Sequence, residues 1–488
     1  MNPAVQSVQD VKGLLPELIL LTTFLVMFAA DLFVQKRHTK WIAAAGIAGL
    51  AAVLWSLLNQ GILLFHQEPV HLFSGMVTVD GFSIYFKWIF VTATGFTLLM
   101  AVRSKEIEKQ NEGEFYLLTV FICLGMFFLA SSTHLLMLLL AFEMVGVLSY
   151  VLAGYLRGDP RSSESGMKYV IYGAFTTGVM IYGMSLLYGL TGSLELRGIR
   201  DALQGMEAGA FPAVVILLLI AVGMFYKIAA APFHMWSPDV YEGAPTPATA
   251  FFSVGPKAAG FAVLIRFFLT TLGYELPISW RQIFMILAIA TMTIGNFTAL
   301  RQNDVKRMLA YSSIAHAGYL LMGLTVLSGD GRAAILFYLV VYMFMNLGAF
   351  LVVLGLENTL GSTDISAYRG IGHALPLPCV AMMIFLFSLT GLPPTAGFVG
   401  KFFLFKTVVE EGLYVLALIG VLNSVISLYY YMRIARTMFL ETPPAGDVTR
   451  SEFPPLYSAL LVLLVAPTLY LGLFFQKLYE LSSGAVFE

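Results

Sequence analysis

Apolar runs of about 20 residues, separated by short polar breaks, follow one another along almost the whole chain. A membrane-spanning helix needs about 20 apolar residues to cross about 30 Å of hydrocarbon. Hydrophobic residues make up 58% of the 488 residues and charged residues 12%, against about 25% charged in a soluble domain. The sequence therefore predicts an all-α polytopic membrane protein with fourteen transmembrane helices. The expected helices span residues 14–34, 41–59, 82–102, 115–130, 134–155, 167–190, 212–231, 248–271, 282–300, 306–326, 333–355, 379–405, 414–438 and 456–476.

Charge and cysteine content narrow the possible functions. The net charge of −1 provides no basic surface for nucleic acid. Cys123 and Cys379 lie in separate apolar runs, so the chain lacks the cysteine spacing of an iron–sulfur or zinc site. We therefore expect no metal or cofactor site here, and any redox cofactor should belong to a partner chain. Residues 1–12 lack a basic leader, and the run from Leu14 to Val34 is too long for a signal peptide, so it should remain as the first helix.

Basic residues are distributed unequally between the alternate connections of the expected helices. Fifteen lie on connections assigned to the inner side or at the helix ends that flank them, and seven lie on the opposite side. Because cytoplasmic loops retain Lys and Arg, this bias places both termini outside, as an even number of helices requires. Six basic residues remain inside the expected helices: Lys87, Lys168, Lys227, Lys257, Arg266 and Lys401.

Lys227 stands deep in an apolar run and is followed by a helix break in GMFYKIAAAPFHMWSPDVYEGAP, residues 223–245. A charge at the bilayer centre costs about 2.5 to 3.5 kcal/mol unless it pairs or reaches water. Glu143, the one acid between residues 134 and 156, is the natural partner. Snorkelling of Lys227 to an interface and a purely structural role for Glu143 are the alternatives. A lysine whose carboxylate partner comes and goes is a proton site with switchable affinity, which favours proton transfer.

The other basic residues within helices differ in what they indicate. Lys257 lies near the middle of its helix and directly follows Pro256, which removes a backbone donor, so we expect a functional site there. Lys168 lies only two residues into its helix, so it could reach the interface or serve as the entrance of a relay. Interfacial anchoring is the expectation for Lys87 and Arg266.

Two histidines lie where protons could pass between the lysines. His234 and His316 titrate near neutral pH, although a lone buried histidine is often a hydrogen-bonded packing residue. His316 shares the segment LAYSSIAHAGYLLMG with Tyr311 and Ser312, whose hydroxyls can hold waters in a chain. We therefore treat all four residues as candidate relay groups.

Matched helix breaks indicate an internal repeat. Pro and Gly interrupt the run SLTGLPPTAGFVGKFFLF at 388–405 just before Lys401, as prolines do just after Lys227. Discontinuous helices in the membrane line cavities or bind ions, and matched breaks in two halves indicate inverted repeats. The expected organisation is a single membrane domain, 1–488, with three N-terminal helices at 14–102, five-helix repeats at 115–271 and 282–438, and a last helix at 456–476.

Three long strings carry a resemblance to a known family. They are PFHMWSPDVYEGAPTPATAFFSVGPKAAGFA at 232–262, NDVKRMLAYSSIAHAGYLLMG at 303–323 and GLPPTAGFVGKFFLF at 391–405. They resemble the antiporter-like membrane subunits of respiratory complex I, the type I NADH:quinone oxidoreductase, over nearly the whole chain. Within that family the pattern is most similar to the N branch, because Lys401 stands where the M branch carries glutamate and the L branch has a long extra lateral helix.

The resemblance implies roles for individual residues. Glu143, Lys227, Lys257 and Lys401 match the family's proton-translocating groups on helices 5, 7, 8 and 12. His234 and His316 match positions thought to join these groups along a hydrated axis. Lys168 matches an accessory lysine near the inner side. The implied fold has fourteen helices with two inverted five-helix repeats, in which helices 7 and 12 are discontinuous.

The resemblance also implies a setting and leaves alternatives. It implies a proton-pumping subunit of a bacterial inner-membrane complex, beside antiporter-like M and small K- and J-type subunits and lipid. FMN, iron–sulfur clusters and quinone would be carried by partner subunits. A subunit of a multi-subunit cation/proton antiporter or of a membrane-bound hydrogenase is the alternative, because those complexes contain related chains. An inert spacer would not explain the ionisable groups near helix breaks.

Overall fold

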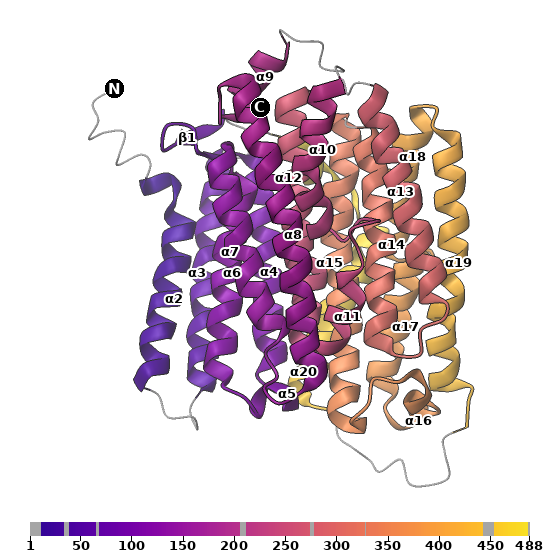
Figure 1. The fold of residues 1–488 in the computed structure, drawn as a ribbon. Coiled ribbons are helices and arrows are strands. Elements are labelled where there is room, and N and C mark those ends of the chain that lie inside the picture. The colour runs from indigo at the N-terminus through magenta and orange to yellow at the C-terminus, as the bar shows by residue number, and fades with distance from the viewer. Residues whose placement is uncertain are drawn as a thin grey trace.

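The structure is a computed structural model that describes residues 11–33, 39–64, 68–204, 211–273, 278–326, 328–442 and 453–486. Within these ranges, 12 helices are long and apolar enough to cross a membrane, and they stand side by side in one bundle (Figure 1). They are α2 (Leu15–Phe33), α3 (Lys40–Leu64), α4 (Gly81–Ala101), α6 (Glu112–Ser131), α7 (Leu135–Ala153), α8 (Pro160–Thr191), α12 (Thr246–Leu272), α13 (Ile278–Ala299), α14 (Val305–Val326), α15 (Gly329–Leu360), α19 (Tyr414–Phe439) and α20 (Pro455–Leu473).

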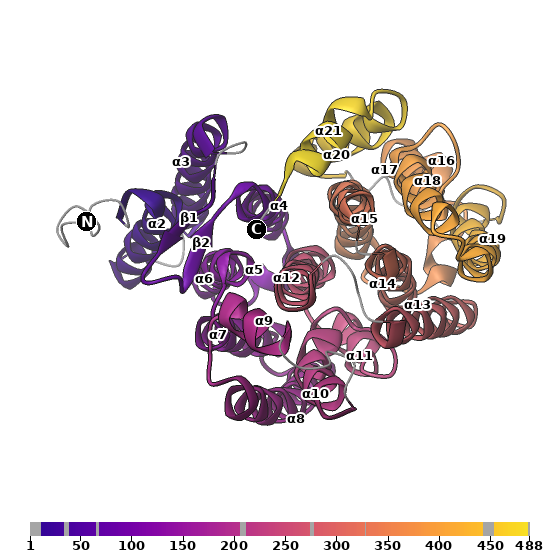
Figure 2. The same ribbon diagram turned by 90° about the horizontal axis from the view of Figure 1, so that it is seen from above.

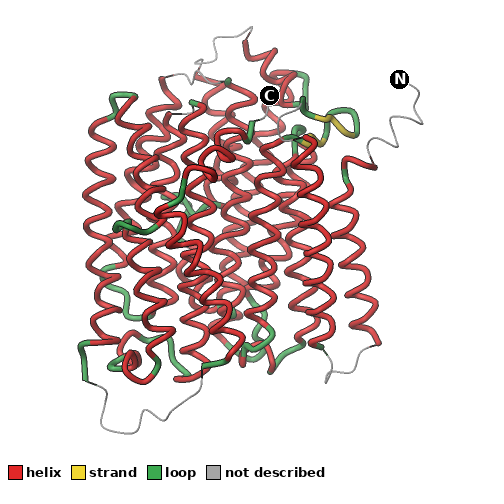
Figure 3. Tube along the Cα trace, turned by 180° about the vertical axis from the view of Figure 1, so that it is seen from behind, coloured by secondary structure: helices red, strands yellow, loops and turns green. Residues whose placement is uncertain are grey.

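Two discontinuous crossings complete the bundle. The first joins α10 (Phe211–Lys227) to α11 (Trp236–Gly243), and the second joins α17 (Pro376–Thr390) to α18 (Ala396–Glu410). Counting each pair once, the described chain has the fourteen membrane helices that the sequence predicts, with the seventh and twelfth broken. Most loops lie at the two ends of the bundle, whereas a few loop segments lie within its depth (Figure 3).

The two breaks end the helices earlier than the hydropathy suggests. α10 stops at Lys227 rather than residue 231, because Ala229 has a left-handed backbone (φ +57°) and Pro232 follows. The expected single helix at 379–405 is two helices, because Gly391 has φ +89° and two prolines follow it before α18 begins. Both breaks therefore arise where the backbone leaves the helical region.

Helices α8 and α15 are longer than the apolar runs predict. Each has 32 residues, whereas the expected bounds were 167–190 and 333–355. α8 begins at Pro160 because the Asp159 side chain accepts from the Arg161 amide and proline suits a first helical position. Hydropathy misses these ends because the helical turns that lie outside each apolar segment contain polar residues.

Small elements connect the crossings. A hairpin of β1 (Val70–Leu72) and β2 (Val77–Val79), which the hydropathy did not reveal, pairs Val70 with Val79 and Leu72 with Val77. Its Leu72, Val77 and Val79 form a small buried cluster with Ile84 at the start of α4. The remaining short helices are α5 (Lys105–Glu108), α9 (Leu196–Gln204), η2 (Ile365–Tyr368), α16 (Ile371–Ala374) and α21 (Gln476–Gly484).

The helices follow the same order twice. α6, α7, the long α8, the broken α10–α11 and α12 are followed by α13, α14, the long α15, the broken α17–α18 and α19. Seen from above, α2 and α3 lie at one end of the bundle, α18 and α19 at the other, and α12 lies near the middle (Figure 2). The apolar window of α12 is 100% buried, and those of α14 and α15 are 89% buried. Groups on these three helices are therefore shielded from lipid by the protein itself.

Two buried ion pairs correct the expectation that Lys87 and Arg266 are interfacial anchors. Lys87 Nζ lies 2.6 Å from Glu17 Oε1, and the two side chains are 0% and 2% exposed. Arg266 binds both carboxylate oxygens of Asp80, at 2.8 and 2.9 Å, and its Nε donates to the Ala130 carbonyl. Both basic residues instead join helices inside the bundle, because acids distant in the sequence compensate their charges.

Candidate functional site

Glu143 and Lys227 face the same region but do not form a contact ion pair. Among the described residues, no carboxylate oxygen lies within 4.0 Å of Lys227 Nζ, and neither this atom nor Glu143 Oε1 has a hydrogen-bond partner. Lys227 Nζ lies 4.8 Å from the centre of the Phe142 ring, the residue next to Glu143 on α7. The Glu143 carboxylate is near enough to act on the ammonium through space. The structure thus places the predicted partners near each other in a separated arrangement.

Glycines make room for the Lys227 side chain. A Cβ at Gly260 of α12 would lie 3.3 Å from Lys227 Cβ and Cγ, so the lysine stem packs directly against that helix backbone. A Cβ at Gly146 of α7 would lie 3.8 Å from Lys227 Nζ. Lys227 is also the last residue of α10, where the free carbonyl end of a helix favours a cation. Local helix geometry therefore holds this 2% exposed lysine between α7 and α12.

Lys257 binds the helix that carries His316. Its Nζ donates to the Ser313 carbonyl at 2.8 Å and also to the Ser313 hydroxyl. Pro256 lies inside α12, which continues without interruption from Thr246 to Leu272. The side chain is 2% exposed, and no carboxylate lies within 4.0 Å of it in the described part of the chain. Lys257 is thus a buried cation with neutral oxygen partners on α14.

His316 belongs to a connected set of hydroxyl groups. His316 Nδ1 lies 2.6 Å from the Tyr338 hydroxyl of α15, and Nε2 lies 3.3 Å from the Tyr431 hydroxyl of α19. The Tyr431 hydroxyl also forms a hydrogen bond with Ser312. Of the predicted relay groups on α14, His316 and Ser312 therefore join this network. The half-buried Tyr311 hydroxyl has no hydrogen bond to any described residue.

We expect Tyr431→Phe to lower proton transfer several-fold. The change removes one oxygen that connects Ser312 to His316 and leaves the ring packing in place. Tyr429→Phe is the matched control, because Tyr429 lies on the same helix but is 68% exposed. Proton pumping in sealed vesicles containing the assembled complex measures the effect. Equal pumping by the two variants would exclude the Tyr431 hydroxyl from the path.

Lys401 lies on α18, beside the break that separates this helix from α17. Its Nζ donates to the Thr390 carbonyl at the end of α17 (2.9 Å) and to the Ser424 hydroxyl of α19 (3.1 Å). It also lies 4.4 Å from the centre of the Tyr319 ring on α14. A cavity of about 310 Å³ between α17, α18 and α19 is lined by Lys401, Thr390 and Ser424 together with apolar side chains. This lysine therefore contacts a helix end, a hydroxyl and a space large enough for several waters.

We expect Gly391→Ala to impair Lys401. Gly391 has φ +89°, and a Cβ there would lie 2.9 Å from Lys401 Cδ, so the variant would carry backbone strain and displace the lysine. Gly412→Ala separates the two effects, because Gly412 has φ +72° with no heavy atom within 4 Å of its Cβ position. Pumping should fall for Gly391→Ala and stay near the native rate for Gly412→Ala. Equal rates would show that crowding of Lys401 is unimportant.

His234 is placed in the first break but apart from the lysines. It follows α10, is 7% exposed, and its Nδ1 has no hydrogen-bond partner among the described residues. No direct hydrogen bond joins it to Lys227 or Lys257 in this part of the chain. Water would have to bridge these groups if His234 takes part in a relay.

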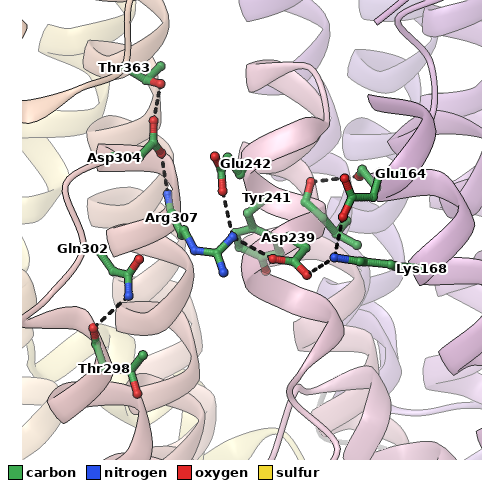
Figure 4. A network of polar contacts seen from close by, with 12 residues as sticks. Glu164, Lys168, Asp239, Tyr241, Glu242, Thr298, Gln302, Asp304, Arg307 and Thr363 are labelled. Atoms are coloured by element: carbon green, nitrogen blue, oxygen red, sulfur yellow. Dashed lines mark hydrogen bonds and ion pairs between the residues drawn. The ribbon is translucent and has the colours of Figure 1, made fainter. Parts of the chain in front are cut away.

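Lys168 belongs to a network of ion pairs that joins α8, α11 and α14 (Figure 4). Its Nζ lies 2.6 Å from Glu164 of α8 and 2.5 Å from Asp239 of α11. Arg307 of α14 binds the other Asp239 oxygen at 2.6 Å and Glu242 at 2.7 Å. Lys168 is 36% exposed, so it reaches the surface as the sequence allows, and it is also paired. Sequence reasoning missed Asp239 and Arg307, because each resembles an ordinary loop charge.

The candidate groups follow a line across the bundle. Glu143 and Lys227 lie on α7 and α10, Lys257 on the central α12, His316 on α14, and Lys401 on α18. Viewed from above, α7 lies on one side of the central α12, α10 lies beside α12, and α14 and α18 follow on the other side (Figure 2). The arrangement offers alternating cations and hydroxyls inside a protein interior, which suits the transfer of protons between buried sites.

Comparison with known proteins identifies the group to which this arrangement belongs. Residues 132–427 match the family model described as NADH:quinone oxidoreductase/Mrp antiporter, transmembrane. A curated relative from Chloroherpeton thalassium, NADH-quinone oxidoreductase subunit N 2, is 43% identical over 99% of this chain and 98% of its own length. A chain of respiratory complex I from Thermus thermophilus is 32% identical with a TM-score of 0.80, covering 96% of this chain and 100% of its own. A chain of the Mrp complex from Dietzia, 22% identical with a TM-score of 0.86 over 98% and 97% of the two chains, shares the fold.

Proposed function

Because the chain belongs to the family of membrane subunits of NADH:quinone oxidoreductases and Mrp antiporters, and within it to the subunit N branch, we propose that it translocates protons in a bacterial NADH:quinone oxidoreductase. The observation that carries this proposal is the line of buried Lys227, Lys257, His316 and Lys401 through the bundle. Stability alone would favour apolar residues at these positions, since each buried charge costs free energy. Their contacts with hydroxyls and with the ends of broken helices support a role in moving protons.

The pair on α7 and α10 acts as the switch in this proposal. Two unit charges 4 Å apart interact by about 4 kcal/mol at an effective dielectric constant of about 20. Closing or opening the gap between Glu143 and Lys227 therefore changes the free energy of the lysine proton enough to drive its transfer. The separated arrangement of the structure corresponds to the open state of the pair, in which Lys227 releases its proton more readily.

The proposed proton path runs through the lysines and the hydroxyl network, and water bridges the groups that do not touch one another. A proton released by Lys227 passes through water to Lys257, whose ammonium donates to Ser313. The Ser312, Tyr431 and His316 network carries it toward α18, because each hydroxyl can accept one proton while it donates another. Lys401 receives it beside the cavity at the second break, which serves as the outer exit. His234 joins the path through bridging water, and Lys168 is an accessory group on the inner side.

The proposal includes the surroundings of the chain. The excess of basic residues on one set of connections supports both termini outside the bacterial inner membrane. NADH oxidation and quinone reduction take place on partner subunits that carry FMN and iron–sulfur clusters. The neighbours in the membrane are antiporter-like M and small K- and J-type subunits, with lipid covering the remaining surface. The five-helix repeats 115–271 and 282–438 are the units that hold the two breaks.

A test of the reaction class uses the chain as a purification handle. If the proposal is correct, an affinity tag on this chain co-purifies flavin and iron–sulfur absorbance together with NADH:quinone oxidoreductase activity. A stand-alone cation/proton antiporter would instead co-purify colourless membrane subunits and exchange cations for protons in vesicles without NADH. A related membrane-bound hydrogenase would bring iron–sulfur proteins without NADH oxidation. Either of these results would contradict the proposal.

A further inference from the structure

Helix α11 is the detached half of the first broken crossing, and charges from two different helices hold it in place. One carboxylate oxygen of Asp239 accepts a hydrogen bond from Lys168 of α8 at 2.5 Å, and the other accepts one from Arg307 of α14 at 2.6 Å (Figure 4). Arg307 also binds Glu242, one turn further along α11. Asp239 is thus a single negative charge shared between the repeat that contains Lys227 and the repeat that contains His316.

The contacts of α11 lead directly to Lys227. Trp236 at its start stacks on Tyr169 of α8, with ring centres 4.4 Å apart and an interplanar angle of 11°. The Trp236 indole N–H donates to the carbonyl of Tyr226, the residue before Lys227, at 3.1 Å. A displacement of α11 would therefore disturb the backbone that carries Lys227.

The same network leads to Lys257 on its other side. Arg307 lies six residues before Ser313, whose carbonyl and hydroxyl accept from Lys257. The neighbouring Lys306 is only 3% exposed, and its Nζ donates to the Ala244 carbonyl at the end of α11 at 2.8 Å. The start of α14 is therefore attached to α11 by two consecutive basic residues.

The network is accessible enough to open. Lys168, Asp239 and Arg307 are 36%, 27% and 31% exposed. A cavity of about 190 Å³ beside them is lined by Arg161, Glu164, Asp239, Glu242, Gly243 and Arg307. Partly exposed ion pairs are individually weak, so such a network can release a helix without disrupting the bundle, whose α12 is buried throughout.

We propose that Asp239 is a positioning residue: by holding α11 against α8 and α14 at once, it couples the Lys227 and Lys257 sites and closes the inner side of Lys227 to water. The assignment of Lys227 to proton transfer rests on the proposed function. The role of Asp239 in holding α11 in place does not depend on the proposed function. Loss of either cation from Asp239 frees α11 and opens the space below the first break.

The accessibility of Ser237 tests the proposal in the assembled complex. Ser237 is 0% exposed and neighbours Asp239 on α11, so a Ser237→Cys thiol reacts with a maleimide only when α11 is released. Asp239→Asn should raise its labelling rate about tenfold. Glu164→Gln is the matched control, because Glu164 binds Lys168 within α8 and forms no ion pair with α11 among the described residues, so its rate should stay unchanged. Amide hydrogen exchange of 236–243 provides the same comparison without the cysteine.

Two further readouts separate positioning from general damage. The natural Cys379 is buried in α17, far along the chain, and its labelling should not change in Asp239→Asn. Pumping should fall in Asp239→Asn and recover in Asp239→Glu, which restores the shared charge. Unchanged labelling at position 237, or increased labelling at Cys379 as well, would overturn the proposal. Normal pumping by Lys227→Ala would instead refute the proposed function and leave the α11 result standing.

Discussion

Lys257→Met should reduce NADH-driven proton pumping by at least about tenfold, because the buried path loses a group that can carry a proton. Methionine retains most of the side-chain volume in the fully buried α12 but cannot carry a proton. The Ser313 carbonyl and hydroxyl lose a donor that no neighbouring lysine replaces. Proton uptake by sealed vesicles, measured per NADH oxidised, gives the effect directly.

Lys406→Met is the control for this loss of charge. Lys406 lies on α18 at 49% exposure, and its Nζ is 3.7 Å from Glu410, so it belongs to a surface ion pair. Such a pair contributes about 0 to 1 kcal/mol, and its removal should leave pumping unchanged. Native pumping by Lys257→Met, with the complex assembled, would show that Lys257 does not lie on the path.

Arg266→Met should destabilise the chain by about 3 to 5 kcal/mol, because it leaves the Asp80 carboxylate buried without its cation. Both side chains are 2% exposed, and Asp80 also caps the first turn of α4 through the Ser83 amide. The loss should appear as reduced amounts of assembled complex on a native gel and as a lower thermal transition. Arg266→Lys should recover part of the stability, since one cation remains near Asp80.

The same measurement distinguishes a structural from a catalytic role for Arg266. Any Arg266→Met complex that does assemble should pump protons with a near-native ratio to NADH oxidised. Full assembly with a native melting temperature would contradict the structural assignment of this ion pair. A lowered pumping ratio in the stable complex would place Arg266 on the proton path.

The physical cost of charge in the membrane made much of the site predictable. Lysines are expensive within apolar runs, so Lys227, Lys257 and Lys401 were identifiable as unusual without any knowledge of their neighbours. The helices and both breaks followed from run length and from proline and glycine. The corrected ends of α10 and α17 depended on the backbone at Ala229 and Gly391, which hydropathy does not describe.

Contacts between distant segments were not predictable. Tyr431 reaches Ser312 from 119 residues away, and Glu17 reaches Lys87 from α2, which no local pattern places beside α4. Lys306 lies at a polar connection in the sequence, yet it is buried because the end of α11 supplies a carbonyl. Such partners are set by how the helices pack, which no local pattern records.

The separation of Glu143 and Lys227 is also not predictable from the sequence. Spacing and composition identify an acid and a lysine that should interact, but not whether the structure holds them in contact or apart. Their distance depends on the Phe142 ring and on the glycines that admit the lysine between α7 and α12. The state of this pair is therefore a property of the packed bundle.

The most direct test of the central claim compares the native chain with Lys227→Ala in sealed vesicles energised by NADH. A native gel establishes that both complexes assemble, and NADH oxidation establishes that electrons still flow. We expect pumping to be lost or strongly reduced in the variant, since α10 then carries no proton site beside Glu143. Unchanged pumping by an assembled Lys227→Ala complex would contradict the account.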